Sequence, residues 1–203
     1  MVGHADPPPL DAGPFPVVVA SVPGQGHLGP IVDAFDVRVD ELLEHLRGHP
    51  VADRLFTTAS HLGDFSLIWH LIAIGRGIHQ RRADQVLVLA VMVGVESLIV
   101  NQGVKRLFRR ERPTTTGHEG LRVRTPSTSS FPSGHASSAA FAAMVLSGWD
   151  GPMRGALWWK VAAIVGLSRA YVRIHHGSDV VAGAIVGTAL GLVGRRIARR
   201  LAP

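Results

Sequence analysis

The side chains best suited to chemistry in this sequence are two histidines, and one of them, His175, is followed four residues later by Asp179. A carboxylate close to an imidazole fixes its tautomer and stabilises the positively charged ring, which is what a nucleophilic or basic histidine requires. Gly177 lies between the two residues, so a helical face and a turn are both compatible with this spacing. A plain ion pair is the alternative interpretation of these two residues taken alone.

The second histidine, His135, follows Pro132, Ser133 and Gly134 and precedes a run of small residues. Ser133 is a natural N-cap, and Gly134 would let a ligand approach the first free backbone N–H groups. A helix N-terminus of this kind binds anions, and His135 would point to where the anion lies. For a lone histidine in this position, a capping or structural role is the more ordinary alternative.

Three cations could hold an anion beside these histidines. Lys105 and Arg112 lie seven residues apart, so both would project from one face if a helix persisted that far. Pro113 predicts that the helix ends at Arg112, which then turns inward. An ammonium and a planar guanidinium together suit a phosphoryl group, although a basic cluster that touches anionic headgroups is the alternative. Arg169 ends another apolar segment, where an unpaired cation is costly, which makes it a candidate site residue.

Five apolar segments must position these residues. They are Leu55 to Ile78, Val86 to Val100, His135 to Gly148, Ala156 to Leu167, and Val180 to Ile197. None is a charge-free run of eighteen residues, so hydropathy alone also allows the buried helices of a soluble protein. The last segment repeats glycine at 183, 187 and 191, a spacing that suits close helix packing in lipid, with a tight glycine face in a soluble bundle as the alternative. We therefore predict an all-α bundle of about five transmembrane helices. Glu96 and Asn101 are expected to make packing hydrogen bonds rather than to contact substrate.

The N-terminal part of the chain has a different composition. Residues 1–30 contain seven prolines with scattered glycines, which predicts a flexible leader. From Ile31 to Arg47 apolar residues recur at three- and four-residue steps between acidic ones, which predicts an amphipathic helix. This helix could pack on the protein's own body or float at a membrane surface. We divide the chain into a leader (1–30), an amphipathic interfacial helix region (31–54) and a membrane-embedded core (55–203).

Charge is distributed unevenly along the 203 residues. The first 54 residues carry eight Asp and Glu against three Arg, whereas the remainder carries eighteen Lys and Arg against seven acids. A cationic body indicates a phosphate-bearing partner, and nucleic acid is the weakest candidate because it explains neither the apolar segments nor the two histidines. The sequence has no cysteine, which excludes disulfides, thiolate metal sites and cysteine nucleophiles. The positive-inside rule assigns one set of basic connections to the cytoplasm. These residues are Arg76, Arg81, Arg82, Arg154, Arg195, Arg196, Arg199 and Arg200. The connections on the other side, 105–132 and 169–179, are basic too, so their charges need a separate task.

Three segments in order, KxxxxxxRP from Lys105, PSGH from Pro132 and SRxxxxxHxxxD from Ser168, resemble the motifs of the type-2 phosphatidic acid phosphatase family. The resemblance covers about Leu55 to Arg200 and leaves the leader outside it. It implies a helical core of membrane spans and a metal-independent phosphatase, without cofactor, that forms a phosphohistidine. Many membrane members of the family have six spans, and here the first is missing or replaced by the amphipathic helix.

The resemblance also implies a role for each motif residue. His175 would be the nucleophile, Asp179 would hold and polarise it, and His135 would protonate the leaving group and then activate water. The phosphate-binding residues would be Lys105, Arg112, Ser133, Gly134 and Arg169. Their cations then have a task outside the cytoplasm, so we expect an extracytoplasmic site in a multi-pass protein of the cell membrane.

The leading interpretation is a membrane phosphatase that acts on a lipid phosphomonoester or diphosphate. Candidate substrates are polyprenyl phosphates or diphosphates, phosphatidic acid, phosphatidylglycerol phosphate and prenyl-linked sugar phosphates, and the sequence does not rank them. A soluble or peripheral acid phosphatase, a vanadate-dependent haloperoxidase and a non-catalytic lipid-phosphate binder or transporter are the alternatives. His135, His175 and Asp179 argue against the binder, which needs cations but no positioned nucleophile. The oligomeric state is open at this stage.

Overall fold

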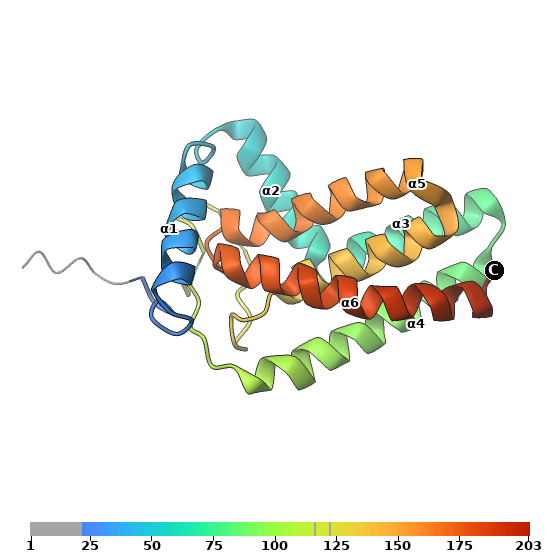
Figure 1. The fold of residues 1–203 in the computed structure, drawn as a ribbon. Coiled ribbons are helices and arrows are strands. Elements are labelled where there is room, and N and C mark those ends of the chain that lie inside the picture. The colour runs from blue at the N-terminus through green and yellow to red at the C-terminus, as the bar shows by residue number, and fades with distance from the viewer. Residues whose placement is uncertain (1–21, 116, 122) are drawn as a thin grey trace, which may run out of the picture.

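The computed structural model describes residues 22–115, 117–121 and 123–203, and every regular element in that part of the chain is a helix. Most of the expected leader (1–30) lies outside the described residues. The helices are α1 (Pro30–Glu44), α2 (Pro50–Gly63), η1 (Asp64–Ser66), α3 (Leu67–Gln80), α4 (Ala83–Leu98), η2 (Ile99–Gly103), η3 (Val104–Leu107), α5 (Gly134–Tyr171) and α6 (Gly177–Leu201). In Figure 1, α1 crosses one end of a bundle in which α3 to α6 run lengthwise.

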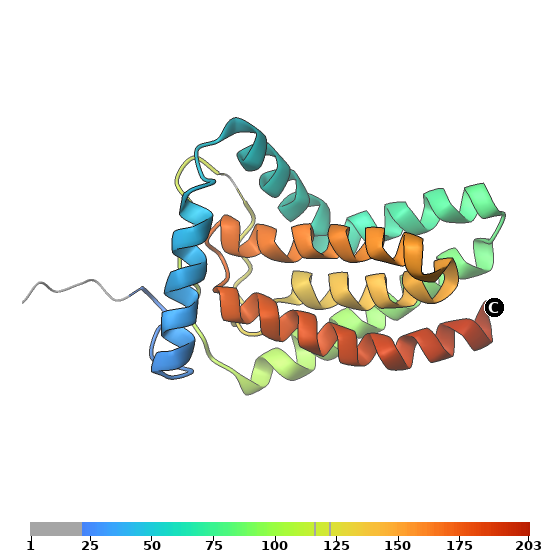
Figure 2. The ribbon, with the colours of Figure 1, turned by 45° about the horizontal axis from the view of Figure 1, so that its top comes forward.

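The third and fourth apolar segments form the two halves of α5. Gly151 has a φ of 77°, a conformation that favours glycine, and Pro152 follows it. The chain reverses direction there, and the two halves run side by side in Figure 2.

The first apolar segment also differs from the prediction, because it breaks into α2 and α3 at η1. Phe65 and Ser66 take left-handed conformations with φ of 51° and 58°, which no continuous helix accommodates.

Glycines at four-residue spacing bring α6 against α5, as predicted. A Cβ added at Gly183 would lie 2.3 Å from the carbonyl oxygen of Ser133, and one at Gly187 would lie 2.0 Å from that of Ser137. Only a residue without a side chain allows this separation. Glu96 is buried and accepts a 2.5 Å hydrogen bond from the Ser137 hydroxyl, which confirms its expected packing role.

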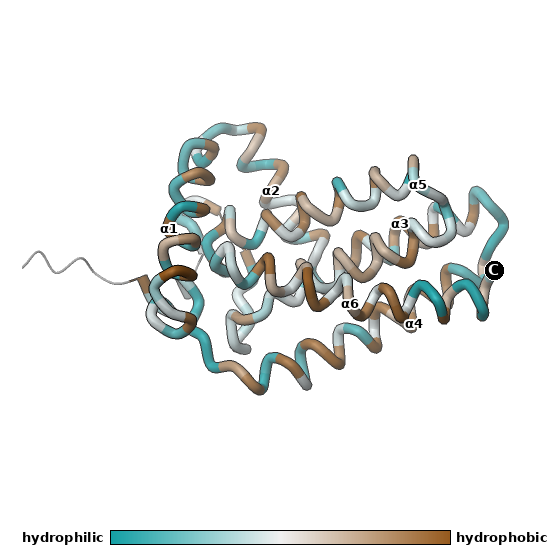
Figure 3. The backbone as a smooth tube through the Cα atoms, in the orientation of Figure 1, coloured by the Kyte–Doolittle hydropathy of each residue, from teal (hydrophilic) through white to brown (hydrophobic). Residues whose placement is uncertain are grey.

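The bundle presents large apolar side chains to its outside. Two helical stretches, Ala83–Leu107 and Gly177–Leu201, are long and apolar enough to cross a membrane, each with 25 residues and mean hydropathies of 1.9 and 1.5. Exposed apolar residues lie on α3, α4 and α6. Examples are Leu71, Ile74, Ile78, Leu87, Val91, Val95, Ile185 and Leu192. Figure 3 shows hydrophobic residues recurring along α4 and α6, whereas hydrophilic residues gather where α6 ends. A surface of this kind suits lipid better than water.

The amphipathic helix forms as α1 and ends at Glu44, three residues before the expected end at Arg47. It rests on the protein's own body, with Asp36 and Leu43 buried. Its apolar residues are not all directed inward, since Ile31 is 86% exposed. Because Asp36 is buried while Ile31 is exposed, α1 contacts the cationic body through part of its acidic side.

Candidate active site

The second and third motif segments meet at the end of the bundle that α1 crosses. The backbone N–H of Ser133 donates to the carbonyl oxygen of Asp179 at 2.9 Å, which joins the start of α5 to the first turn of α6. The backbone N–H groups of Ile174 and His175 both donate to the carbonyl oxygen of Arg169, at 3.2 and 3.1 Å. The loop that carries His175 is therefore anchored on the last turn of α5.

His175 and Asp179 form a buried pair, 3% and 0% exposed. His175 precedes α6, whose N-cap is His176, so the pair sits at a helix start rather than on a helical face. The Asp179 Oδ2 lies 3.4 Å from the His175 Nδ1 and accepts hydrogen bonds from the backbone N–H of His176, at 2.9 Å, and from the Ser130 hydroxyl. The carboxylate thus faces Nδ1 and favours the tautomer that carries its proton there.

The other ring nitrogen of His175 faces a cation. The Nη1 of Arg112 lies 3.0 Å from the His175 Nε2, and a guanidinium can only donate, so Nε2 holds a lone pair. Burial lowers the pKa of His175 well below its ordinary value of 6.5; Asp179 opposes this shift, and the charges of Arg112 and Lys105 add to it. The imidazole is therefore neutral at neutral pH, with its nucleophilic nitrogen directed at the cationic side of the site.

Arg112 reaches this position from an irregular segment. The helix ends at Leu107, and Phe108 is extended, so the prediction that the helix continues to Arg112 was wrong. Carbonyl oxygens hold the guanidinium instead, among them that of Ile174 at 2.8 Å and that of Thr128 at 3.1 Å. Burial lowers the pKa of Arg112, although its value stays far above neutrality because guanidinium is so strong a base. Arg112 is thus a fixed positive charge beside the nucleophile.

Arg169 and Lys105 are buried cations with unused donors. Arg169 is 0% exposed, and its Nη1 donates to the Ser60 hydroxyl at 2.5 Å. Its Nε and Nη2 have no hydrogen-bond partner among the described residues. These two nitrogens form one edge of the guanidinium, the edge that binds two oxygens of a phosphoryl group side by side. Lys105 is 5% exposed, and its ammonium makes no hydrogen bond or ion pair within the described part of the chain.

His135 lies in the first turn of α5, next to a carboxylate that the sequence analysis missed. Its Nε2 is 3.1 Å from the Oδ1 of Asp64, and the same oxygen is 3.9 Å from the Nη1 of Arg169. Asp64 begins η1, the break between α2 and α3. A Cβ at Gly63 would lie 2.5 Å from the His135 ring, so glycine is needed there for the approach. The Gly-Asp interruption of an apolar segment was the one available signal for Asp64.

The remaining predicted residues shape the helix start. Ser133 is the N-cap of α5, as predicted, and its Oγ accepts the backbone N–H of Ala136 at 3.4 Å. A Cβ at Gly134 would meet the Asn101 side chain at 2.9 Å. The predicted site residues gather at one end of the bundle. Arg169 lies between the two histidines, since its carbonyl oxygen accepts the backbone N–H of His175 and its Nη1 lies 3.9 Å from Asp64, the partner of His135. No cluster of His, Asp and Glu suited to a metal ion occurs in the described ranges.

Two imidazoles at the starts of α5 and α6, with two carboxylates and three cations from other segments near them, are suited to phosphoryl transfer. A family model described as the PAP2 superfamily matches residues 85–202, more than half of the chain. The chain belongs to the PAP2 superfamily. It is 34% identical over 151 residues to decaprenylphosphoryl-5-phosphoribose phosphatase from Mycobacterium tuberculosis, covering 70% of this chain and 81% of that protein. It is 30% identical over 156 residues to phosphatidylglycerophosphatase B from Bacillus subtilis, covering 70% and 72%.

The fold of this PAP2 protein is that of transmembrane relatives. The crystal structure of a transmembrane PAP2 type phosphatidylglycerolphosphate phosphatase from Bacillus subtilis superposes with a TM-score of 0.66 at 24% identity, covering 85% of this chain and 89% of the other. The family and the relatives make the protein a lipid phosphate phosphatase. Together with the two span-length helices, the shared fold indicates a membrane location. The PAP2 match begins after α3, so α1 and Asp64 lie outside it.

Proposed function

We propose that this protein is an integral membrane phosphatase that cleaves a lipid phosphomonoester or diphosphate through a phosphohistidine, without a metal ion. The observation that carries the proposal is the buried His175, whose Nδ1 faces Asp179 and whose Nε2 faces Arg112. A non-catalytic binder would need the cations alone. A neutral imidazole with its lone pair directed at the anion site supplies the nucleophile as well.

In the first step, Nε2 of His175 forms a bond to phosphorus while the bond from phosphorus to the leaving oxygen breaks. The leaving oxygen takes the electron pair and receives a proton from His135, and Asp179 stabilises the imidazole ring as it becomes positive. In the second step, His135 removes a proton from water, whose oxygen attacks phosphorus. The bond between nitrogen and phosphorus then breaks, and its electron pair returns to His175.

The cations surround the phosphoryl group, whose transition-state charge is spread over the equatorial oxygens. The free edge of Arg169 would bind two of these oxygens. A phosphoryl oxygen would also compete with the His175 Nε2 for the Nη1 of Arg112, so substrate binding itself exposes the nucleophilic lone pair. The proposed phosphate-binding residues are Lys105, Arg112, Ser133, Gly134 and Arg169.

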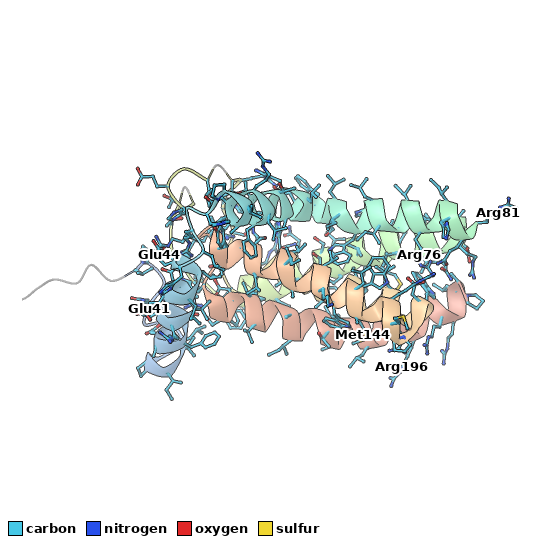
Figure 4. The ribbon with its side chains drawn as sticks, turned by 90° about the horizontal axis from the view of Figure 1, so that it is seen from above. Glu41, Glu44, Arg76, Arg81, Met144 and Arg196 are labelled. Carbon is cyan, nitrogen blue, oxygen red and sulfur yellow. The ribbon has the colours of Figure 1, made fainter. Side chains whose placement is uncertain are left out.

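Charge along the bundle supports a site outside the cytoplasm. In Figure 4, Glu41 and Glu44 lie on α1, at one end of the bundle. Arg76, Arg81 and Arg196 lie toward the opposite end. The positive-inside rule assigns the arginine-rich end to the cytoplasm, which leaves the catalytic end on the other side. In this arrangement the bundle (55–203) spans the membrane about five times, and the 31–54 region lies at its interface.

The names of two relatives support a substrate class for this protein. One is a decaprenylphosphoryl-5-phosphoribose phosphatase and another a phosphatidylglycerophosphatase, names that both indicate a phosphate monoester on a lipid-linked headgroup. We therefore place lipid phosphomonoesters first for this protein, ahead of diphosphates. The exposed apolar sides of α3, α4 and α6 favour such a substrate over a small soluble phosphoester.

A phosphate-release panel in detergent tests this function. Purified protein is supplied with polyprenyl-linked and glycerolipid phosphomonoesters, a polyprenyl diphosphate and a water-soluble phosphoester, each in excess EDTA. We expect lipid monoesters to be hydrolysed fastest, with EDTA having no effect and vanadate inhibiting as a mimic of pentacoordinate phosphorus. Release that stops with chelator, or a clear preference for the soluble ester, would contradict the proposal.

Asp64 is expected to support His135 as the general acid, because a carboxylate 3.1 Å from the ring stabilises its protonated form. We predict that Asp64→Asn lowers kcat by about 10- to 100-fold on a lipid monoester, by analogy with the loss seen when the carboxylate partner of a metal-bound histidine is removed. The loss should shrink on an ester with a strongly acidic leaving group, which needs no proton. Asp84→Asn, which removes an exposed carboxylate paired with Arg82, is the control. An equal loss on both esters would contradict this role.

A further inference from the structure

Behind Asp179 lies a buried arginine, Arg110, which belongs to no motif and has no place in the mechanism above. It is 3% exposed, and its Nη1 donates to the Asp179 Oδ1 at 2.7 Å. Because Asp179 uses Oδ2 for Ser130 and His175, Arg110 occupies its other oxygen. The rotamer of this carboxylate is thus determined from both sides.

The same guanidinium reaches a second buried carboxylate, that of Asp36 on α1. Its Nη2 donates to the Asp36 Oδ2 at 2.6 Å, and Asp36 is 5% exposed. Asp36 also accepts hydrogen bonds from the backbone N–H of Ser178 at 2.7 Å and from its hydroxyl at 2.8 Å. α1 is thereby attached to the first turn of α6, next to Asp179.

The position of Arg110 is itself set by the segment that carries Ser130. The backbone N–H of Ser130 donates to the Arg110 carbonyl at 2.9 Å, and the Arg110 N–H donates to the Ser129 hydroxyl at 3.2 Å. The side chain also donates from Nε to the Gly24 carbonyl at 3.1 Å. Its Nη1 also donates to the Ser178 hydroxyl at 2.7 Å. Arg110 therefore joins Gly24 and Asp36 of the N-terminal region to Asp179 and to the segment that carries Ser130.

We propose that Asp36 and Arg110 are positioning residues for the nucleophile, acting through Asp179 on His175, so that α1 is part of the catalytic apparatus. This inference rests on the proposed function of His175. The contacts run in series from Asp36 to Arg110, Asp179 and His175, and three of these four residues are charged and almost completely buried beside one another. Burying two carboxylates and one guanidinium costs desolvation free energy, which is recovered only if every hydrogen bond among them has good geometry. We therefore assign the cluster a role in holding Asp179 in place rather than in stabilising the fold.

Loss of Asp36 leaves Arg110 with a single carboxylate partner, and the guanidinium can then rotate toward Asp179. A displacement of about 1 Å in a catalytic group can lower a rate about 100-fold. Substrate binding should change little, because neither Asp36 nor Arg110 bonds any of the three cations proposed to hold the phosphoryl group. The expected signature is therefore a lower kcat at constant KM.

The test compares Asp36→Asn with Asp40→Asn in the full-length protein, on the best lipid monoester of the panel. Asp40 also lies on α1 and also pairs with arginines, Arg47 at 2.7 Å and Arg173 at 2.8 Å, but neither of these contacts Asp179. We expect Asp36→Asn to lower kcat by about 10- to 100-fold with KM within twofold, a size typical of lost supporting residues. Asp40→Asn should keep kcat within threefold. The proposal would be overturned if both variants lost kcat to the same extent and if that loss followed the decrease in their melting temperatures.

A double-variant cycle tests whether Asp36 acts through Asp179. In an Asp179→Asn background, Asp36→Asn should have no further effect on kcat, since its route to the nucleophile is already gone. A full additional loss there would overturn the proposal. If Asp36→Asn cannot be purified, Arg110→Lys replaces it. Arg110→Lys keeps the buried positive charge, but one ammonium cannot bridge Asp36 and Asp179 as the guanidinium does. A wild-type kcat in this variant would also overturn the proposal. Failure of the wild type to release phosphate would refute the proposed function instead.

Discussion

His175→Ala is expected to reduce phosphate release from a lipid monoester to background, a loss of at least about 10⁴-fold, as for other enzymes that lose a nucleophile or its immediate partner. The nitrogen that forms the covalent intermediate is gone, and no other described imidazole faces Arg112. The cations remain in place, so the variant should still bind the lipid phosphate. A rapid quench with labelled substrate, at alkaline pH where phosphohistidine survives, checks the intermediate.

His176→Ala is the control for this variant, because it removes an adjacent buried histidine whose ring contacts neither Arg112 nor the Asp179 side chain. The His176 Nδ1 lies 4.0 Å from the Asp36 Oδ2, so a modest loss of activity through Asp36 is expected. The His176→Ala variant should keep activity within about tenfold, with some loss of stability from the helix start that His176 caps. A labelled protein in the His175→Ala variant would show that another residue is the nucleophile.

The depressed pKa of His175 sets the sign of its pH dependence. A group whose pKa is lowered by burial stays neutral at pH values where a free histidine is protonated. As pH falls through 6.5, the ordinary histidine value, the nucleophile should therefore remain active. A fall in kcat/KM in step with an ordinary histidine titration would contradict the buried, neutral state of this ring. Titration of the substrate phosphate is measured separately with a substrate analogue, and that of His135 with a His135 variant.

Arg169→Lys is expected to lower kcat/KM by about 10²- to 10³-fold, the loss measured when one preorganised donor to a transition-state oxygen is removed. The charge is retained, but an ammonium cannot place two parallel N–H groups where Nε and Nη2 of the arginine lie. Inhibition by vanadate should weaken by a similar factor, since the same edge would bind its oxygens. Phosphate-release kinetics with and without vanadate measure both effects.

Arg173→Lys is the control for Arg169→Lys. Arg173 lies four residues after Arg169, in the connection between α5 and α6, but its guanidinium is partly exposed and pairs with Asp40 and Glu44 on α1. Partly exposed ion pairs contribute little, so this variant should stay within about threefold of the wild type. Unchanged vanadate inhibition in Arg169→Lys would contradict the proposal that Arg169 binds the phosphoryl group.

Two nitrogens of the buried Arg169 have no hydrogen-bond partner among the described residues, which supports its proposed place in the phosphate site. A buried guanidinium edge is unfavourable unless a group accepts its hydrogen bonds, and no described residue does so here. Such local costs are common at functional sites, where the ligand supplies the missing contacts. We therefore expect the phosphoryl group of the substrate to restore the hydrogen bonds of this residue.

The sequence alone determined the helical character of the chain, the motif residues and the glycine contact between α5 and α6. These features depend on short spacings, because a helix repeats every 3.6 residues and a small residue every four positions makes a continuous close-packing face. The N-cap at Ser133 and the amphipathic α1 belong to the same group. Each could be predicted because the interacting residues lie within a few positions of one another.

Only the tertiary structure decided which side chains from distant segments meet at the site. Asp64 reaches His135 across 71 positions, and Asp36 reaches Arg110 across 74. No local pattern marks such a pair, since its geometry depends on how several helices pack and on where the chain breaks between α2 and α3. Arg112 shows the same limit: its inward turn was predicted, but its contact with the nucleophilic nitrogen depends on carbonyl oxygens brought in from other segments.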